Sequence, residues 1–196
     1  MALNANALTT LNQAKTYLKI PLAETSQDAM VELFINAASE ELERQCDRVL
    51  KKRTGIVEYR NGRGAPVLTL HEWPVVAVTE VRVDYESLFT DPATVVPSGE
   101  VAVADGDTSI MRLNSRWPNA ERSMKVTYSA GYDPVPADLE HACLWLVYWY
   151  AKIRDAGDIG RTTKNKEGES ISYLQTAPQA VKDAIARYKR TDFPQE

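Results

Sequence analysis

The chain of 196 residues is poor in the residue types from which metal sites and disulfide frameworks are built. It has two cysteines, Cys46 and Cys143, and two histidines, His71 and His141. Two cysteines do not make a disulfide framework or a zinc site, and each lies in an apolar helical pattern where a thiol packs as a small hydrophobe. The histidines form no metal-binding motif. We therefore expect no metal and no cofactor.

The sequence also lacks a long apolar run and an excess of positive charge. Its longest dense apolar run, Leu144–Ala151, is too short to span a membrane, and the first residues do not resemble a secretory signal. We therefore expect no membrane partner. The formal net charge is −4. Since sequence-independent DNA binding needs clustered Lys and Arg, the chain as a whole is not built to neutralise phosphates.

No motif predicts catalysis. Gly62-Arg63-Gly64 is the nearest approach to a glycine-rich loop. It lacks the Gly-Lys-Ser/Thr ending of a phosphate-binding loop, so we interpret it as a hairpin turn. A nucleophile and a base that meet only in space would leave no such signature. The small number of histidines and the lack of an activated-serine motif nevertheless favour a protein that is not an enzyme.

Two helical patterns open the chain. Thr10 and Gln13 have the form of a capping box before a short helix that Pro21 stops. A second helix begins near Thr25 with an acidic residue, Asp28, in its first turn. The apolar residues of this second helix recur at helical spacing and are interpreted as its buried side, with the acidic residues on the solvated face. They are Met30, Leu33, Phe34, Ala37, Ala38, Leu42, Cys46 and Val49.

From Thr54 the apolar period changes to two. Several short strands separated by turn residues are typical of a small antiparallel sandwich or barrel. We predict strands at residues 56–60, 67–70, 81–85, 101–103, 109–113 and 124–128. A local basic bias in the later strands predicts contact with DNA or an acidic partner. It consists of Arg112, Arg116, Arg122 and Lys125.

A third helix, from Pro136 to Ala156, is the most informative element. It contains Leu144–Tyr150, which is apolar on every side, and a helix apolar all round must be buried all round. A small domain easily buries one face of such a helix, whereas burying every face usually needs a neighbouring chain. Because aromatic residues are enriched in interface cores, we predict a subunit interface here. The candidate residues are Trp145, Tyr148, Trp149 and Tyr150.

The predicted fold class is α+β. Residues 1–53 and 131–196 form a bundle of about four helices, and residues 54–130 form an antiparallel β-rich insertion between helices 2 and 3. The polar segment Asp158–Glu169 is expected to be mobile, because few apolar anchors offset its ordering entropy. Residues Thr176–Gln179 then cap the last helix.

The order of these segments resembles the head–tail connector proteins (adaptor or head-completion proteins) of tailed double-stranded-DNA bacteriophages. The resemblance lies in the opening Leu8-Thr9-Thr10-Leu11 and in the second helix, Asp28–Cys46. It continues in Trp73–Val83, which resembles a Pro-Val-x-x-Val-x-x-Val strand signature. It also includes Val126–Tyr132 followed by Val135–Leu139. These residues resemble a junction of that family in which a tyrosine is followed by Gly-Tyr and then by Val-Pro.

This resemblance implies a structural virion protein at the head–tail interface. It implies a ring of about twelve subunits beneath the portal, which extends the DNA channel and offers a surface to the next tail or head-completion component. Assembly would take place in the cytoplasm of the bacterial host. An acidic chain repeated around such a ring lets DNA slide past with only transient, non-specific contact.

In resembling proteins the C-terminal segment reaches the portal, so Tyr188, Arg190 and Phe193 are portal-docking candidates. Two alternatives stay open at this point. The first is a tail-side completion or tail-terminator ring protein. The second is a nucleic-acid-binding module or an enzyme within the strand-rich middle.

Overall fold

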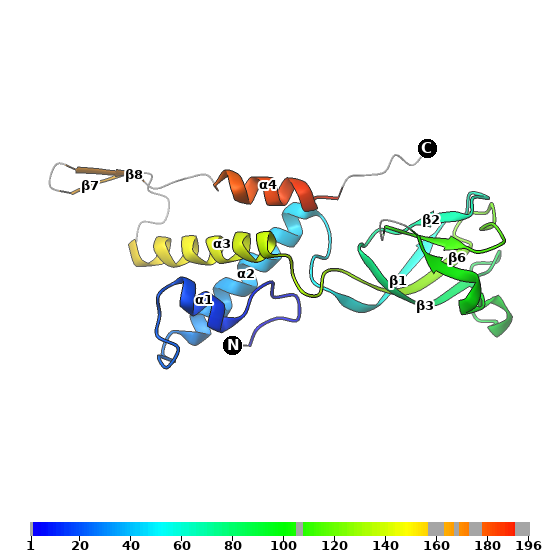
Figure 1. Cartoon of the computed structure of the whole chain (residues 1–196), viewed down its shortest axis with the longest axis horizontal. Helices are drawn as coiled ribbons and strands as arrows, with labels where there is room; N and C mark the ends of the chain where they lie inside the picture. The colour runs from blue at the N-terminus through cyan, green and yellow to red at the C-terminus, as the bar shows by residue number, and fades with distance from the viewer. Residues whose placement is uncertain (1, 105–107, 157–162, 167–168, 173–177, 191–196) are drawn as a thin grey trace. The chain divides into compact units, whose positions relative to one another are not determined.

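The chain forms one helical and one β-rich unit. The computed structural model describes residues 2–104, 108–156, 163–166, 169–172 and 178–190. One compact unit comprises Met1–Arg48 with Pro134–Glu196, and the other comprises Val49–Asp133 (Figure 1). The second unit is inserted between the second and third helices. The predicted α+β class, with an antiparallel insertion at this point, is confirmed.

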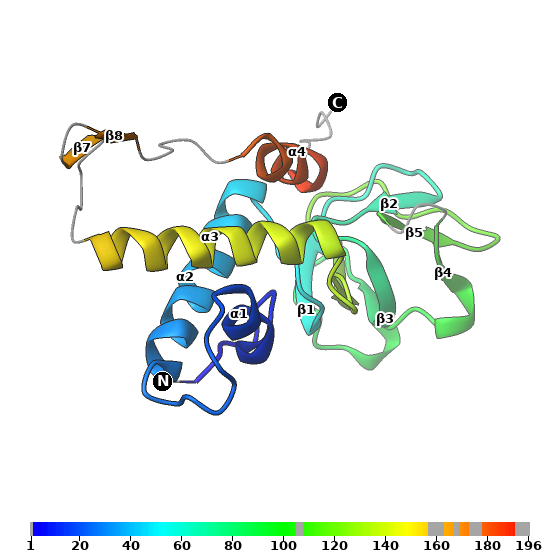
Figure 2. The same cartoon turned by 60° about the vertical axis from the view of Figure 1, so that its left-hand side comes forward.

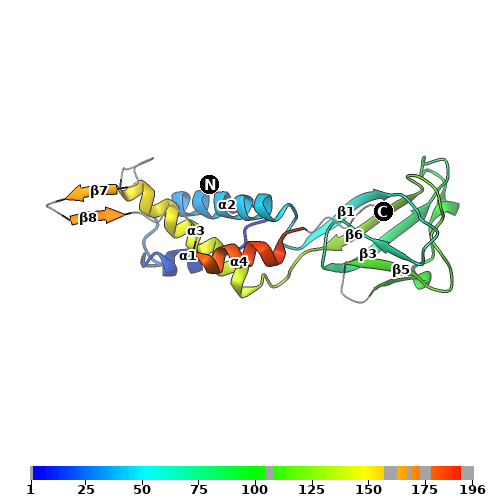
Figure 3. The ribbon, with the colours of Figure 1, turned by 90° about the horizontal axis from the view of Figure 1, so that it is seen from above.

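Four α-helices build the helical unit. They are α1 (Leu11–Tyr17), α2 (Asp28–Cys46), α3 (Ala137–Ala156) and α4 (Gln179–Tyr188). Helices α2 and α3 pack on each other, and α1 and α4 each pack on both of them (Figure 2). Helix α4 runs antiparallel to α3, as the view from above shows (Figure 3).

The first helix is fixed at both ends by polar contacts. The predicted capping box is present: the Thr10 side chain accepts from the Gln13 N–H at 3.3 Å, and the Gln13 side chain accepts from the Thr10 N–H at 3.1 Å. Near the other end, Lys15 is only 1% exposed. Its Nζ donates to the Leu22 carbonyl at 3.0 Å and lies 2.7 Å from Asp28 Oδ1. This lysine therefore ties the connection after α1 to the start of α2.

The buried faces of α2 and α3 meet around small and polar side chains. The Ser39 hydroxyl lies 3.6 Å from the Cys143 sulfur and accepts from the Leu8 N–H at 3.0 Å. The ring of Tyr150 lies 6.0 Å from that of Phe34. The predicted packing of the third helix on the second is thus confirmed.

Two three-stranded antiparallel sheets build the other unit, in the orders β1-β6-β3 and β2-β5-β4. The strands are β1 (Arg53–Arg60), β2 (Val67–Thr69), β3 (Val75–Val83), β4 (Val101–Val103), β5 (Ser109–Arg112) and β6 (Met124–Ala130). A single hydrophobic cluster draws residues from both sheets, among them Leu68, Ile110, Val126 and Tyr128. The sheets therefore share one core, as in a small sandwich.

The predicted hairpin turn at Gly62–Gly64 is wrong. Strands β1 and β2 belong to different sheets, and the Gly62 N–H donates to the Ala120 carbonyl at 2.8 Å instead. A Cβ atom on Gly62 would lie 1.7 Å from the Pro118 carbonyl oxygen. Glycine is needed here for close approach between two chain segments rather than for a two-residue turn.

A buried carboxylate is held inside the β-rich unit. Glu58 is 8% exposed and accepts from the Tyr128 hydroxyl at 2.6 Å and from the His71 N–H at 3.1 Å. The Nε of Arg60 lies 3.4 Å from it. Buried charges persist in proteins when they are paired and hydrogen-bonded, and Glu58 satisfies both conditions.

The segment expected to be a mobile loop, Asp158–Glu169, contains paired residues where it can be described. Strands β7 (Thr163–Lys166) and β8 (Glu169–Ser172) pair there in an antiparallel hairpin. The remaining residues of the predicted loop, 158–162 and 167–168, lie outside the described residues. The N-cap of α4 is Pro178, which makes no side-chain cap, while Thr176 and Ala177 also lie outside them.

Candidate subunit-interface surfaces

Helix α3 carries the four aromatic residues predicted at a subunit interface and places three of them on one side. Trp145, Tyr148 and Trp149 have the spacing i, i+3, i+4, whereas Tyr150 points about 100° away from Trp149. Tyr148 is 40% exposed, whereas Trp145, Trp149 and Tyr150 are half-buried in the helical unit. Tyr148 is therefore the member of the set with the largest free surface.

Tyr150 packs against Trp149 on its own helix and against Phe34 on α2. The ring centroids of Tyr150 and Trp149 are 5.5 Å apart. Burial raises the pKa of the Tyr150 hydroxyl, and the nearby Glu41 carboxylate raises it further. These contacts give Tyr150 a packing role within the subunit.

The exposed side of α3 carries an aromatic ladder, which we call the aromatic face: Tyr17, His141, Tyr148 and Lys152. The Tyr17 ring from α1 stands edge-on to both His141 and Tyr148, at 6.2 Å in each case. The Lys152 ammonium lies 5.4 Å from the centre of the Tyr148 ring. Lys152 makes no ion pair among the described residues, so the aromatic face presents a cation beside its rings.

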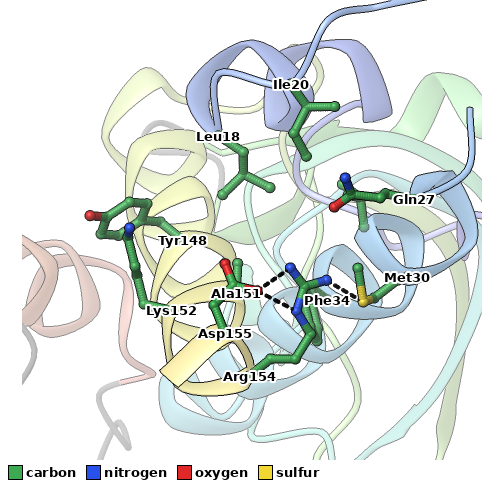
Figure 4. Close-up of a pocket in the computed structure, with 11 residues that line it drawn as sticks. Leu18, Ile20, Gln27, Met30, Phe34, Tyr148, Ala151, Lys152, Arg154 and Asp155 are labelled. Atoms are coloured by element: carbon green, nitrogen blue, oxygen red, sulfur yellow. Dashed lines mark hydrogen bonds and ion pairs between the residues drawn. The ribbon is translucent and has the colours of Figure 1, made fainter. Parts of the chain in front are cut away.

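A small open pocket of about 120 Å³ adjoins the aromatic face (Figure 4). Apolar side chains from the end of α1, from α2 and from α3 line much of it. They include Leu18, Ile20, Met30, Phe34 and Tyr148. The Arg154 guanidinium lies over the Phe34 ring at 6.0 Å, contacts the Met30 sulfur and pairs with Asp155.

Helix α2 has an exposed apolar stripe that the sequence pattern assigned to its buried side. We call Ala29, Leu33, Ala37 and Glu40 the α2 outer face, because all four are exposed and recur at helical spacing. Leu33 is 47% exposed, so its predicted place in the core is wrong. The signal was in the sequence: the apolar residues of α2 cover more than one stripe, and only one can face α3.

Two of the predicted portal-docking residues are held inside the helical unit. The Tyr188 hydroxyl donates to Asp138 Oδ1 at 2.9 Å, which ties the end of α4 to the start of α3. The Arg190 N–H donates to the Cys46 carbonyl at 2.8 Å. Together these bonds tie the end of α4 and Arg190 to the start of α3 and to the end of α2. Phe193 lies outside the described residues.

The four basic residues predicted to contact DNA or an acidic partner lie in two places within the β-rich unit, Arg112 with Arg116 and Arg122 with Lys125. Arg112 lies 3.2 Å from the carboxylate of Glu100, and its Nη1 donates to the Arg116 carbonyl at 3.5 Å. The side chain of Arg116 donates to the Gly64 carbonyl at 3.1 Å. The charge of Arg112 is thus offset within the unit.

The second pair lies on the exposed face of the sheet β1-β6-β3. The Arg122 guanidinium stacks 4.8 Å from the centre of the Tyr59 ring, and Lys125 is the cross-strand neighbour of both Tyr59 and Arg82. Arg82 is paired with Glu80 at 2.7 Å. Arg122 and Lys125 therefore supply the net positive charge of this face, beside a tyrosine that is 44% exposed.

The two cysteines are fully buried core residues. Burial raises the pKa of the Cys46 thiol and that of the Cys143 thiol to about 11 each. A thiol with a raised pKa is a poor nucleophile at neutral pH. In the described part of the chain, no three His, Cys, Asp or Glu residues cluster in a way that could hold a metal ion. Nor does any described helix have the length and apolar character needed to cross a membrane.

Comparison with known families shows the family to which the chain belongs. The model of the head completion protein family matches residues 7–191 of this chain. The chain belongs to the head completion protein family. The predicted family is confirmed, and with it the role of a structural virion protein at the head–tail junction. A comparison with curated proteins finds no match.

Solved structures of gene transfer agent (GTA) particles contain chains with the same fold. A chain from the neck of a native GTA particle, computed with C12 symmetry, is 19% identical with a TM-score of 0.63, covering 97% of this chain and 96% of its own. A chain from the neck of an empty particle, computed with C6 symmetry, is 18% identical with a TM-score of 0.62, covering 97% and 94%. A chain from the virion of a native particle is 19% identical with a TM-score of 0.63, covering 97% and 93%.

Proposed function

We propose that this chain is a non-enzymatic subunit of a ring of about twelve copies in the neck of a virion, beneath the portal. The match of the head completion family to residues 7–191 is the observation that carries the proposal. The similar GTA necks were computed with C6 and C12 symmetry, and a ring of twelve subunits is compatible with both.

The charge and the exposed surfaces of the chain suit this role. Each copy has a formal net charge of −4, so a ring of about twelve repels the phosphates of DNA that passes through it. A closed ring needs two different patches that meet head to tail. The helical unit offers two such patches, the aromatic face with Tyr148 and the α2 outer face with Leu33.

We place the portal contact in the segment that follows Arg190. Tyr188 and Arg190 are bonded to Asp138 and to the Cys46 carbonyl, so they anchor the beginning of that segment rather than reach outward themselves. Phe193 is the aromatic residue of the segment. The variant Phe193→Ala should lower portal binding, and an unchanged circular dichroism spectrum would show that the fold is retained.

The sheet face with Arg122 and Lys125 suits an acidic protein surface, such as that of the next neck or tail component. Two net cations are few for DNA, whose binding scales with the number of phosphates neutralised. Exposed apolar groups accompany them, since Tyr59 is 44% and Val57 is 49% exposed. The double variant Arg122→Glu/Lys125→Glu should weaken binding of that component. Salt-dependent DNA binding by the whole chain, lost in the same variant, would instead assign this face to DNA.

The direct test of the role is partner choice. The purified chain is incubated separately with the portal ring and with the tail-tube protein of the same particle, and bound material is recovered by pull-down. We expect capture by the portal. Capture by the tail tube alone would favour the alternative, a tail-side completion or terminator ring, and capture by neither would contradict both.

A further inference from the structure

The two exposed stripes of the helical unit lie on opposite sides of the α2–α3 pair. Helix α2 packs on α3 through Ser39, which contacts Cys143, while Leu33 lies on the other side of α2 and is exposed. On α3, Cys143 is fully buried, while Tyr148 and Lys152 lie on the exposed side. Helices α1 and α4 cover the two remaining sides (Figures 1 and 2).

The shapes of the two stripes are complementary. The aromatic face projects large rings, since Tyr17 is 37% and Tyr148 is 40% exposed. The α2 outer face has one large apolar residue, Leu33, between two alanines, Ala29 and Ala37, one helical turn away on either side. Small residues beside a larger one leave recesses on a helix surface, and side chains of a facing helix fill such recesses.

The charges of the two stripes are complementary as well. The aromatic face carries Lys152, which makes no ion pair among the described residues. The α2 outer face ends in the exposed carboxylate of Glu40, whose neighbour Glu41 is paired within α2 to Arg44. The Glu40 carboxylate accepts an exposed bond from the Asn4 amide at 3.2 Å, which leaves its charge without a cationic partner among the described residues. Opposite charges at the rim of an interface set its register and orientation.

We infer that the aromatic face of one subunit packs against the α2 outer face of the next, head to tail around the ring. The inference rests on the proposed ring and names the surfaces that close it. Tyr148 and Tyr17 of one copy contact Leu33 and the flanking alanines of the second copy, with Lys152 near Glu40. Patches on opposite sides of a subunit suit a ring of about twelve, where successive copies turn by about 30°.

Cross-linking between two engineered cysteines tests this contact. Ala37→Cys lies on the α2 outer face and His141→Cys on the aromatic face, and both substitutions leave Tyr148, Leu33 and Lys152 in place. The native Cys46 and Cys143 are 0% exposed, so a flexible bis-maleimide reacts with the introduced thiols only. In the portal-bound assembly, the double variant should give a ladder of covalent oligomers.

Matched controls separate this contact from chance proximity. Each single-cysteine variant should give no cross-linked oligomers, because a head-to-tail contact does not bring two copies of the same patch together. The pair Ala37→Cys/Tyr85→Cys, whose second site is exposed on the β-rich unit, should also give no ladder. Coupling in either single variant would show a self-complementary contact and overturn the inference.

A charge reversal gives a second readout. Lys152→Glu and Glu40→Lys should each weaken self-association by about three- to tenfold, and the combined variant should recover most of that loss. Sedimentation of the portal-bound assembly measures the effect. Rings that form with the portal, but give no cross-linked ladder in the double-cysteine variant and no recovery in the combined charge-reversal variant, would overturn the inference. The proposed function would then still stand. Failure to form any ring with the portal would instead contradict the proposed function, and the inference with it.

Discussion

The buried Lys15 gives the sharpest prediction about stability. Its side chain is 2% exposed, and its Nζ bonds to the Leu22 carbonyl at 3.0 Å, to the Glu24 carbonyl and to Asp28 Oδ1 at 2.7 Å. The substitution Lys15→Met preserves the length and the apolar stem of the side chain. It removes the donor from all three acceptors, so the perturbation is the lost charge rather than lost volume.

The size of the destabilisation depends on how far water can replace the lysine as the partner of the Asp28 carboxylate. Removing one partner of a buried ion pair costs about 3–5 kcal/mol, because the other charge stays without compensation. The Asp28 side chain is 27% exposed, so water can hydrate its carboxylate in part. We therefore expect Lys15→Met to lower the free energy of unfolding by about 3 kcal/mol, the lower end of that range.

Urea unfolding followed by circular dichroism at 222 nm measures this loss. All four α-helices belong to the unit that contains Lys15, so the helical signal reports on that unit. Lys19→Met is the matched control, because Lys19 is exposed and its loss should change stability by no more than about 0.5 kcal/mol. Equal midpoints for the two variants would refute the assigned role of Lys15.

Two further predictions concern the close contact in the β-rich unit and the buried thiols. Gly62→Ala places a Cβ atom 1.7 Å from the Pro118 carbonyl oxygen. This overpacking should lower the free energy of unfolding by about 1–3 kcal/mol, as measured by thermal unfolding. The control Gly99→Ala, whose Cβ atom would have no atom within 4 Å, should be near neutral. A near-neutral Gly62→Ala would show that the two segments are not held together. The Cys143 thiol has a pKa raised by burial from 9.0 to about 11, so its contribution to stability is full below pH 9 and is lost as the pH rises to about 11. Cys143→Ala should therefore flatten the fall in the free energy of unfolding across that range, and an unchanged slope would contradict the assignment.

The elements with regular apolar patterns could be predicted from the sequence, and their bounds were close. The capping box at Thr10 fixed the start of α1, and β4 falls on the predicted residues 101–103. Strand β3 begins at Val75, six residues before the start that alternation indicated, because Val75-Val76-Ala77-Val78 does not alternate. The strand signature of the resembling family, Trp73–Val83, covers these residues. The strands β7 and β8 escaped prediction because Ile171 is their one apolar residue, which leaves no apolar face to mark a period.

The candidate site could be predicted only in part. The excess of apolar residues on α3 singled out a helix whose most exposed aromatic residue is Tyr148, and the subunit interface expected there stays a prediction. The neighbour of Tyr148 within the chain, Tyr17 from α1, depends on how the helices cross, and so does the place of the α2 outer face that we propose as its contact in the next copy. Periodicity along one segment cannot show which of two apolar stripes faces inward, and for that reason Leu33 was assigned to the wrong side.

Imaging of the portal ring with the purified chain bound tests the central claim most directly. We predict a continuous ring of twelve copies stacked beneath the portal, with the aromatic face of each copy against α2 of the next. Portal rings that carry no added density, or a chain that binds only the tail tube, would contradict the account.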